Sequence, residues 1–318
     1  MKHVAIVGAG GIGQRHLQSC AGLPSVEFEL HVVEPDETSR GNAQRLAGAA
    51  NVRWYDNVEA LPSHLDLAVI ATRADMRARV TREIVETTSS RLLILEKVLF
   101  QRADQYREIG ELFERLGVSA WVNCPRRLWP AYRDLAARIS PERILRIATV
   151  GKSWDIGCNA IHFLDLFEYL TATTRATVDK VDLTLVHPAK RQGMLHIEGA
   201  VTGALGASSS RSVGFEIVSR PDYEGAQMIV IETVDGCFLV NEGDVVTVKA
   251  PGGAVASYSV PFQSQLTAGT VESILATGRC DLASYALSRQ LHETLLDKMR
   301  GALGRAGHLS DPEVCPVT

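Results

Sequence analysis

Long apolar runs, closely spaced cysteines and an excess of one charge are missing from this sequence of 318 residues. No stretch approaches the roughly 18 continuous apolar residues of a membrane-spanning helix, so we expect no membrane partner. The six cysteines lie far apart and no histidines are paired at ligand spacing, which predicts free thiols and no metal site. Acids and bases are scattered and give a net charge of −4, which argues against nucleic-acid binding.

Signals for secretion and for disorder are missing as well. The first residues pass directly into an apolar run without the charged and apolar segments of a leader, so we expect a cytoplasmic location. Hydrophobic residues make up 46% and charged residues 22%, as in globular proteins. Because 318 residues exceed the usual size of one domain, we expect two domains.

The pattern of apolar segments divides the chain into two parts. Over residues 1–123, short apolar runs alternate with amphipathic stretches, which predicts an α/β dinucleotide-binding domain with a doubly wound parallel sheet, the Rossmann fold. Over residues 124–318, alternating apolar residues separated by turns such as Asp235-Gly236 predict a substrate-binding α+β domain with a large, open, mostly antiparallel sheet. An open sheet face favours pairing of copies, so we expect a homodimer or homotetramer.

The most specific local motif is a glycine pattern, G-x-G-x-x-G, directly after the first apolar run. Gly8 permits the tight turn, Gly10 lets the backbone approach a pyrophosphate, and Gly13 lets the following helix pack close to the strand. Gly11 and Ile12 lie at the start of that helix, whose free N–H groups favour phosphate oxygens. We therefore assign all five residues to cofactor binding.

The choice of cofactor depends on Glu34, which ends the second expected strand, Phe28 to Val33. A carboxylate at this position holds a ribose 2′-hydroxyl and repels a 2′-phosphate, so the sequence favours NAD over NADP. Arg40 leaves NADP open, because its guanidinium is near enough in sequence to reach a 2′-phosphate. A solvated carboxylate at a strand end is the other interpretation of Glu34.

Two clusters carry candidate catalytic groups. Lys97 follows an apolar run and so lies at the carboxyl end of a parallel strand, where a lysine with a lowered pKa exchanges a proton with a substrate hydroxyl. A simple ion pair at a strand end explains the same position. Further on, Cys158, His162 and Asp165 share one face of an expected helix, which suits proton transfer by the histidine, with the aspartate orienting it or accepting a hydrogen bond from a substrate hydroxyl. A hydrogen-bonded core histidine is the alternative.

Four segments together resemble the glucose–fructose oxidoreductase/inositol dehydrogenase (Gfo/Idh/MocA) family: GAGGIGQRH at the start, EK after the fifth expected strand, VNCPRRLWPAY at the domain junction, and GCNAIHFLDL in the second domain. The resemblance implies a Rossmann domain, an open-sheet domain, and NAD(P)-dependent oxidation or reduction of a sugar or polyol carbon. It also implies that Lys97 and His162 are catalytic.

The sequence departs from the family pattern around the expected nicotinamide site. The E-K-P signature ends in Val98 instead of proline, which puts the backbone bend after Lys97 in doubt. Where many members carry a histidine after the fourth strand, this chain has Arg77. The resemblance assigns cofactor contacts to residues after the fourth and fifth strands: Thr72, Arg73, Arg77 and Glu96.

A second departure concerns the D-x-x-x-H pair of many family dehydrogenases, because Cys158 stands at the aspartate position. A thiol cannot replace an orienting carboxylate unless its pKa lies well below about 8.5. Either His162 works alone with Lys97, or Asn159 and Asp165 position the substrate, or another residue transfers the proton.

The arginines of the junction favour an anionic substrate. The segments around them are most similar to the family branch linked to surface polysaccharides and nucleotide sugars, and Arg126 and Arg127 suit the phosphates of such substrates. A structural arginine pair that ties the domains together is the alternative.

The resulting prediction is an NAD(P)-dependent oxidoreductase that transfers a hydride between nicotinamide and a carbon of a sugar, sugar phosphate or nucleotide sugar. Lys97, assisted by His162, moves the proton. Two alternatives stay open: a non-catalytic dinucleotide-binding regulator or scaffold of the same fold, and a reductase of a C=N or C=C bond.

Overall fold

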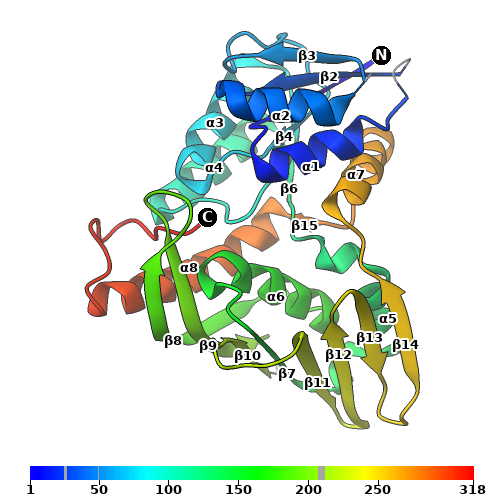
Figure 1. Ribbon diagram of the computed structural model, residues 1–318, viewed down its shortest axis with the longest axis vertical. Helices are drawn as coiled ribbons and strands as arrows, with labels where there is room; N and C mark the ends of the chain where they lie inside the picture. Colours follow the sequence, from blue (N-terminus) through cyan, green and yellow to red (C-terminus); the bar gives the residue numbers. More distant parts are fainter. Residues whose placement is uncertain (25–26, 49, 207–211) are drawn as a thin grey trace. The chain divides into compact units, whose positions relative to one another are not determined.

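The computed structural model describes residues 1–24, 27–48, 50–206 and 212–318, and the chain forms two compact units (Figure 1). Unit 1 comprises Met1–Phe100, Asp104–Pro125 and Pro261–Ala286. Unit 2 comprises Gln101–Ala103, Arg126–Val260 and Leu287–Thr318. Residues 261–286, which the sequence pattern assigned to the second domain, thus pack with the first unit.

Unit 1 is built on a seven-stranded sheet, sheet A, with the strand order β15-β6-β5-β4-β1-β2-β3. Every pairing in it is parallel except that of β15 with β6. Its strands are β1 (Lys2–Val7), β2 (Phe28–Val33), β3 (Val52–Tyr55), β4 (Leu67–Ile70), β5 (Leu92–Leu95), β6 (Ser119–Val122) and β15 (Ala283–Ser284). This order confirms the predicted Rossmann fold.

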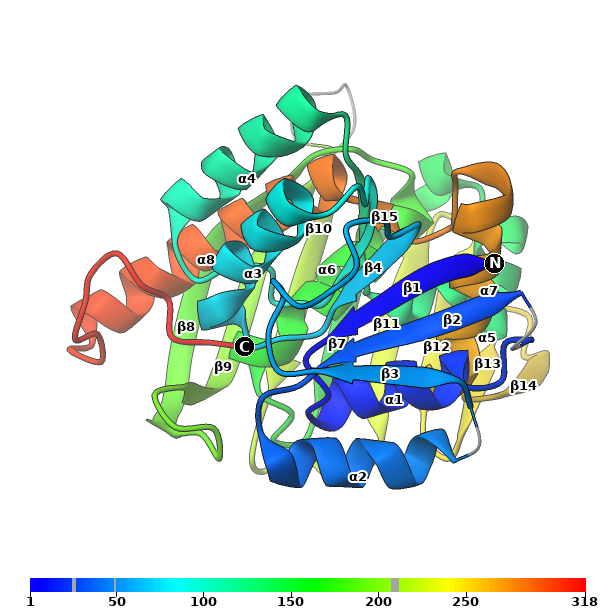
Figure 2. The ribbon, with the colours of Figure 1, turned by 90° about the horizontal axis from the view of Figure 1, so that it is seen from above.

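Helices cover both faces of sheet A, with α1 (Gly11–Cys20) and α2 (Glu37–Ala47) on one face and α3 (Ala74–Thr87) and α4 (Ala103–Leu116) on the other (Figure 2). Two-sided cover explains why β4 is apolar at every position and fully buried. Helix α7 (Gln263–Thr277) packs on α1, where the Ala268 N–H donates to Ser19 Oγ at 2.9 Å.

Unit 2 is built on an eight-stranded sheet, sheet B, with the order β14-β13-β12-β11-β7-β10-β9-β8. Its pairings are antiparallel except for β7 with β10, which confirms the large, mostly antiparallel sheet. Its strands are β7 (Ile144–Gly151), β8 (Ala176–Pro188), β9 (Leu195–Leu205), β10 (Val213–Ser219), β11 (Gln227–Thr233), β12 (Gly236–Glu242), β13 (Val245–Lys249) and β14 (Val255–Ser259).

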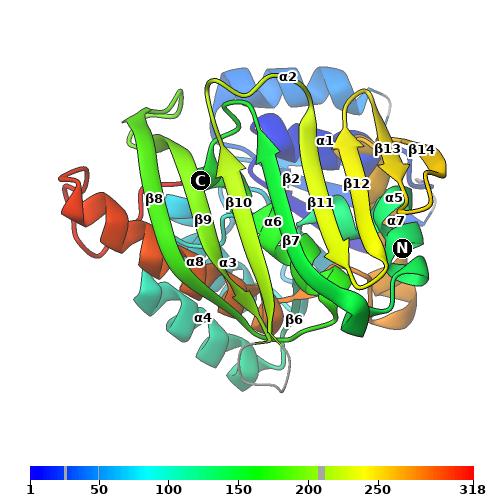
Figure 3. The same ribbon diagram turned by 90° about the horizontal axis from the view of Figure 1, so that it is seen from below.

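Three helices accompany sheet B: α5 (Pro130–Arg138), α6 (Ile156–Thr171) and α8 (Tyr285–Arg305). Figure 3 shows the sheet with α6 and α8 behind it. Alternate residues of β10 are buried, and Phe215 among them packs on Phe167 of α6 with ring centroids 6.4 Å apart. Two 3₁₀ helices, η1 (Pro125–Leu128) and η2 (Pro141–Arg143), flank α5.

Helix α8 is 21 residues long. It carries ion pairs along its length, such as Arg289 with Glu293 at 3.0 Å. Within the described parts of the chain, no helix combines the length and the apolar character that crossing a bilayer requires.

Candidate active site

The glycine turn follows β1 and leads into α1. Gly8 has a φ of +91°, and a Cβ built on it would lie 3.1 Å from the backbone nitrogen of Thr72. A Cβ on Gly13 would lie 1.9 Å from the carbonyl oxygen of Gly8, which no side chain can tolerate. By contrast, nothing lies within 4 Å of a Cβ on Gly10 or Gly11. Internal packing thus requires Gly8 and Gly13, while Gly10 and Gly11 leave space where a ligand approaches.

The first turn of α1 suits the diphosphate of a dinucleotide. Gly10 is the N-cap residue and has no side chain to cap the helix. The first N–H groups of a helix have no partner within it and carry the positive end of the helix dipole. Gly11, Ile12 and Gly13 supply these groups here, so the turn can bind phosphate oxygens through its backbone.

Glu34 lies directly against the glycine turn. Its Oε2 accepts a hydrogen bond from the Ala9 N–H at 2.6 Å, and its Oε1 accepts one from the Asp36 N–H at 3.0 Å. The carboxylate is therefore fixed at the end of β2 beside the turn, and the interpretation as a freely solvated strand end does not describe it.

Arg40 turns toward the backbone of its own loop. Its Nε donates to the carbonyl oxygen of Glu34 at 2.9 Å, and its Nη2 pairs with the carboxylate of Asp56. Carbonyl and carboxylate oxygens thus already surround the guanidinium that the sequence offered for a 2′-phosphate.

The segment after β4 contains one residue that differs from its predicted role. Arg77 is only 2% exposed, and its guanidinium donates to the carbonyl oxygens of Val98, Leu99 and Thr72. The predicted cofactor contact is therefore corrected to a structural one, because α3 buries Arg77 between the segments that follow β4 and β5. Arg73 precedes α3 as its N-cap residue and pairs with Asp75 at 2.9 Å.

The side-chain hydroxyl of Thr72 is a further candidate for a cofactor contact. Its Oγ1 is buried and has no hydrogen-bond partner among the described residues. The Thr72 backbone also lies directly beside Gly8, with its nitrogen 3.1 Å from a Cβ built on that glycine. A buried hydroxyl beside the glycine turn fits a cofactor contact, because burial without a partner is costly.

Glu96 also departs from the predicted cofactor contact. It is 3% exposed, and its Oε1 accepts hydrogen bonds from His16 Nε2 at 2.9 Å and from Asn123 Nδ2 at 2.5 Å. His16 Nδ1 in turn lies 2.8 Å from Thr267 Oγ1 on α7. The carboxylate therefore joins β5, α1, α7 and the end of β6.

This buried network keeps Glu96 ionised. Burial alone would raise the pKa of the Glu96 carboxyl, but the hydrogen bond and charge of His16, the hydrogen bond from Asn123 and the charge of Lys97 outweigh it. Together they hold that pKa below its ordinary value. Glu96 is thus an anion adjacent to Lys97 at neutral pH.

Lys97 is held from both sides by these contacts. Glu96 before it is bound by His16 and Asn123, and the carbonyl oxygens of Val98 and Leu99 after it are bound by Arg77. Lys97 itself is half-buried, and the peptide bond between Lys97 and Val98 is cis although no proline is present. The backbone on either side of the lysine is therefore anchored to three other segments of unit 1.

In unit 2, the first turns of α6 carry Cys158, Asn159 and His162, all half-buried. The helix is capped by Asp155, whose Oδ1 accepts hydrogen bonds from the N–H groups of Gly157 at 3.1 Å and Ile197 at 3.0 Å. Asn159 Nδ2 donates to the Trp154 carbonyl oxygen at 2.6 Å. The cap and this bond fix the start of α6, from which His162 projects one turn later.

Asp165 and Arg127, which the sequence assigns to substrate binding, pair with each other in the structure. Asp165 is 0% exposed, and its two carboxylate oxygens accept from Arg127 Nε and Nη2, each at 2.9 Å. Arg127 Nη2 also pairs with Glu168 at 2.9 Å. These groups thus pair with one another in the core of unit 2.

Arg126 is likewise engaged within unit 2. It forms a two-pronged ion pair with Glu242, at 2.9 Å from Nε and 2.8 Å from Nη2, and Tyr132 also binds that carboxylate. Its guanidinium stacks 4.3 Å from the ring centroid of Phe163. This pairing therefore does not support the predicted contact of Arg126 with a substrate phosphate.

The comparisons with known proteins support the family indicated by the sequence. Residues 2–124 match the model of the oxidoreductase family with an NAD-binding Rossmann fold (GFO_IDH_MocA). A comparison with curated proteins gives no significant match.

Solved structures resemble both units. An oxidoreductase from Agrobacterium radiobacter, in complex with NAD⁺, L-tartaric acid and magnesium, has a TM-score of 0.75 at 14% identity, covering 96% of this chain and 97% of its own. UDP-N-acetylglucosamine 3-dehydrogenase GnnA from Acidithiobacillus ferrooxidans has a TM-score of 0.71 at 16% identity, with 95% and 97% covered.

A third similar structure is a super-repressor mutant of Gal80p from Saccharomyces cerevisiae, with a TM-score of 0.69 at 15% identity over 96% of this chain and 97% of that one. Identities this low show the fold alone. The glycine turn, the strand order of sheet A and the family match agree with one another. Residues 2–124 of this chain thus match the Gfo/Idh/MocA family of oxidoreductases with an NAD-binding Rossmann fold.

Proposed function

We propose that the protein is an NAD-dependent dehydrogenase that acts on a carbon of a sugar, sugar phosphate or nucleotide sugar. The observation that carries this proposal is the anchoring of Lys97 at the carboxyl end of β5, in the same sheet whose β1 and β2 end at the glycine turn and Glu34. In parallel sheets the carboxyl ends of the strands are the ligand-binding edge.

The residues of this edge fit a dinucleotide. The backbone N–H groups of residues 11–13 would hold the diphosphate, Glu34 the ribose hydroxyls, and the buried Thr72 hydroxyl a further polar group. When bound, the nicotinamide supplies or accepts the hydride. NAD is favoured over NADP because Glu34 repels a 2′-phosphate, while Arg40 is paired with Asp56 and its own loop.

Lys97 is proposed as the group that exchanges a proton with the substrate hydroxyl or carbonyl oxygen. Its anchored backbone limits where the ammonium group can lie, which is what proton transfer requires. His162 is proposed to assist, with Asn159 as a contact for substrate hydroxyls. Cys158 stands where many relatives have an aspartate. Proton transfer to or from the substrate is therefore proposed to depend more on Lys97 than in those relatives.

The sugar class rests on the fold likeness to UDP-N-acetylglucosamine 3-dehydrogenase and on the family resemblance. The charge of the substrate is not decided by Arg126 and Arg127, since both are paired with carboxylates. Neutral sugars, sugar phosphates and nucleotide sugars therefore belong in the same assay panel.

The test is a turnover assay, following NADH absorbance with this panel, on wild type and Lys97→Met. We expect Lys97→Met to bind NAD as wild type does and to lose about 10²–10⁴-fold in kcat, the usual contribution of an acid–base group. Lys249→Met, at an exposed lysine of β13, is the matched control and keeps full activity. Undiminished turnover in Lys97→Met removes the lysine from the mechanism.

A non-catalytic regulator is the second candidate function, favoured by Cys158 at the aspartate position and by the fold likeness to Gal80p. A regulator binds NAD(H) and a protein partner but leaves the bound cofactor unchanged with every sugar offered. If the cofactor is oxidised only by imines or enones, the bond reduced is C=N or C=C, which is the remaining alternative.

We also propose that the protein forms a homodimer or homotetramer through sheet B. The partly exposed positions of β7 and β11 include Val150, Met228 and Val230, and Arg146 on the same strands pairs with Glu216 at 2.6 Å. Such a mixed apolar and charged sheet face suits a two-fold interface. Light scattering on wild type and Val230→Glu tests this, and a monomeric wild type contradicts it.

A cytoplasmic location belongs to the same proposal. Cys20 and Cys315 are buried thiols, and burial raises the pKa of each to about 12. Thiols persist in reducing compartments. Fractionation of cells that express the protein tests the location.

A further inference from the structure

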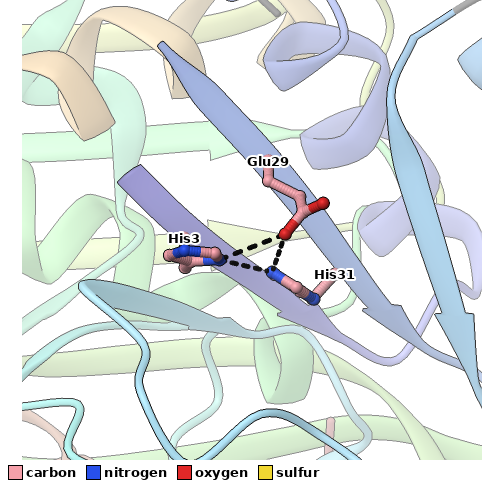
Figure 4. Close-up of side chains that lie close together, drawn as sticks. All are labelled: His3, Glu29 and His31. Atoms are coloured by element: carbon pink, nitrogen blue, oxygen red, sulfur yellow. Dashed lines mark hydrogen bonds and ion pairs between the residues drawn. The ribbon is translucent and has the colours of Figure 1, made fainter. Parts of the chain in front are cut away.

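Three potential metal ligands meet on sheet A, at the end of β1 opposite to the glycine turn. His3 is the second residue of β1, and Glu29 and His31 belong to the neighbouring β2. The parallel register pairs His3 with Glu29 and Ala5 with His31, so the three side chains emerge on the same face of the two strands. Figure 4 shows them converging on one point.

Two of the three distances between the ligand atoms match a metal site, and the third, between the two histidines, is that of a hydrogen bond. His3 Nδ1 lies 3.0 Å from His31 Nε2 and 3.3 Å from Glu29 Oε2, and His31 Nε2 lies 3.5 Å from the same oxygen. Zinc binds imidazole nitrogen and carboxylate oxygen at about 2.0–2.2 Å. In a tetrahedral site, ligand atoms are then about 3.3–3.6 Å apart, which follows from these bond lengths.

We propose that His3, Glu29 and His31 form a binding site for a divalent transition metal ion, with Zn²⁺ as the preferred ion. Two imidazoles and one carboxylate favour zinc and its neighbours over magnesium and calcium, which prefer sites built from oxygen ligands. Three protein ligands leave a fourth coordination position for water.

Groups around the triad orient two of the ligands. The Tyr55 hydroxyl lies 2.9 Å from His31 Nδ1. When Nε2 binds the ion, Nδ1 carries the ring proton and donates a hydrogen bond to the Tyr55 oxygen. Arg53 Nε donates to Glu29 Oε1 at 2.6 Å, which leaves Oε2 to face the histidines. Such hydrogen bonds to the atoms that do not bind the metal are typical of zinc sites.

The cluster also has an explanation that needs no ion. Without an ion, two imidazole nitrogens and a carboxylate oxygen face one another, and protons shared among them are the competing explanation.

Solvent can reach the site through His3. Its side chain is 27% exposed, whereas that of His31 is 2% exposed. His64 lies next to His3, with ring centroids 5.8 Å apart, but it is 67% exposed and lies outside the triad. His64 therefore provides a matched control for substitutions of His3.

The experiment is a calorimetric titration of Zn²⁺ into the full chain after removal of metals by a chelator. We expect about one Zn²⁺ per chain for the wild type. His3→Gln is expected to weaken binding at least about 100-fold and Tyr55→Phe about tenfold, while His64→Gln leaves it within about threefold. Circular dichroism and the NAD titration check that each variant folds.

Two results overturn the proposal. Failure of the wild type to bind Zn²⁺ shows that shared protons hold the cluster together. Binding that survives both His3→Gln and Glu29→Gln shows that the ion lies elsewhere. Substitution of Co²⁺ for Zn²⁺ gives a second readout, since the visible spectrum of a tetrahedral His₂Glu site must disappear in His3→Gln.

Discussion

Two buried carboxylate clusters, one in each unit, respond to burial in opposite ways. In unit 1, Glu96 has His16 and Asn123 as donors to a single carboxylate, and its pKa lies below the ordinary value. In unit 2, Asp165 and Glu168 share one guanidinium, that of Arg127, and the pKa of each carboxyl is raised by burial. Burial is the largest cause in both clusters, so the number of carboxylates per donor decides the outcome.

The difference has consequences for stability. A carboxyl with a lowered pKa stabilises the fold above its ordinary pKa, and this contribution is lost as the pH falls through the lowered value. Carboxyls with raised pKa values behave oppositely, because their contribution is present at low pH and is lost as the pH rises through the folded pKa. Glu96 therefore stabilises unit 1 as an anion beside Lys97 at neutral pH. Asp165 and Glu168, by contrast, lower the stability of unit 2 as the pH rises.

The largest expected effect comes from removing the shared donor. Arg127→Met leaves Asp165 and Glu168 together in the core without a positive charge, and we expect the free energy of unfolding to fall by about 3–5 kcal/mol at neutral pH. Urea denaturation measures it. Because protonation relieves the two carboxylates, the loss should shrink as the solution is acidified, and a loss independent of pH contradicts this explanation.

A second prediction concerns the pH dependence of stability that Glu168 alone contributes. Its pKa is raised to about 7 by burial, with the charge of Arg127 opposing and that of Asp165 adding to the shift. The wild type should therefore lose stability relative to Glu168→Gln as the pH rises from about 5 to about 8, by as much as about 3 kcal/mol. Asp297→Asn, at an exposed helical ion pair, is the control and shows no such trend.

The parts that sequence could predict are those encoded locally. The glycine turn is a motif of six consecutive residues, and the strands of sheet A are short apolar runs. The Rossmann fold and the position of Lys97 at a strand end therefore follow from neighbours along the chain. Glu34 was found by the same means, because it directly ends β2.

The parts that sequence missed depend on partners far along the chain. Arg77 was assigned to a ligand by the resemblance and Arg127 by residue type, yet their acceptors on Val98 and Asp165 lie 21 and 38 residues away and are buried with them. His16 meets Thr267, 251 residues later, because α7 returns to α1. The triad of His3, Glu29 and His31 exists only through the register of β1 and β2, which no spacing within one segment reveals.

A smaller effect is expected at the network that supports Lys97. His16→Phe removes the donor to Glu96 and the contact with Thr267 while keeping a ring in the core, so we expect kcat to fall about tenfold through misplacement of Lys97. NAD affinity and KM should stay unchanged. Because loss of His16 raises the pKa of Glu96, the fall of kcat on the acid side of its pH profile should begin at a higher pH. His16→Gln, which retains a donor, should restore part of the rate. Equal losses in kcat and in NAD affinity would indicate a general disturbance of unit 1.

The smallest expected effect concerns a third carboxylate, Glu34, whose donors are the backbone N–H groups of Ala9 and Asp36. Glu34→Gln keeps an acceptor for one of these amides and removes the charge that repels a 2′-phosphate. We expect the preference for NAD over NADP to fall about fivefold, roughly 1 kcal/mol, with little change in stability. Fluorescence titrations with both cofactors measure it. An unchanged preference would assign cofactor choice to other residues, and Arg40→Ala then shows whether the arginine beside Glu34 contributes.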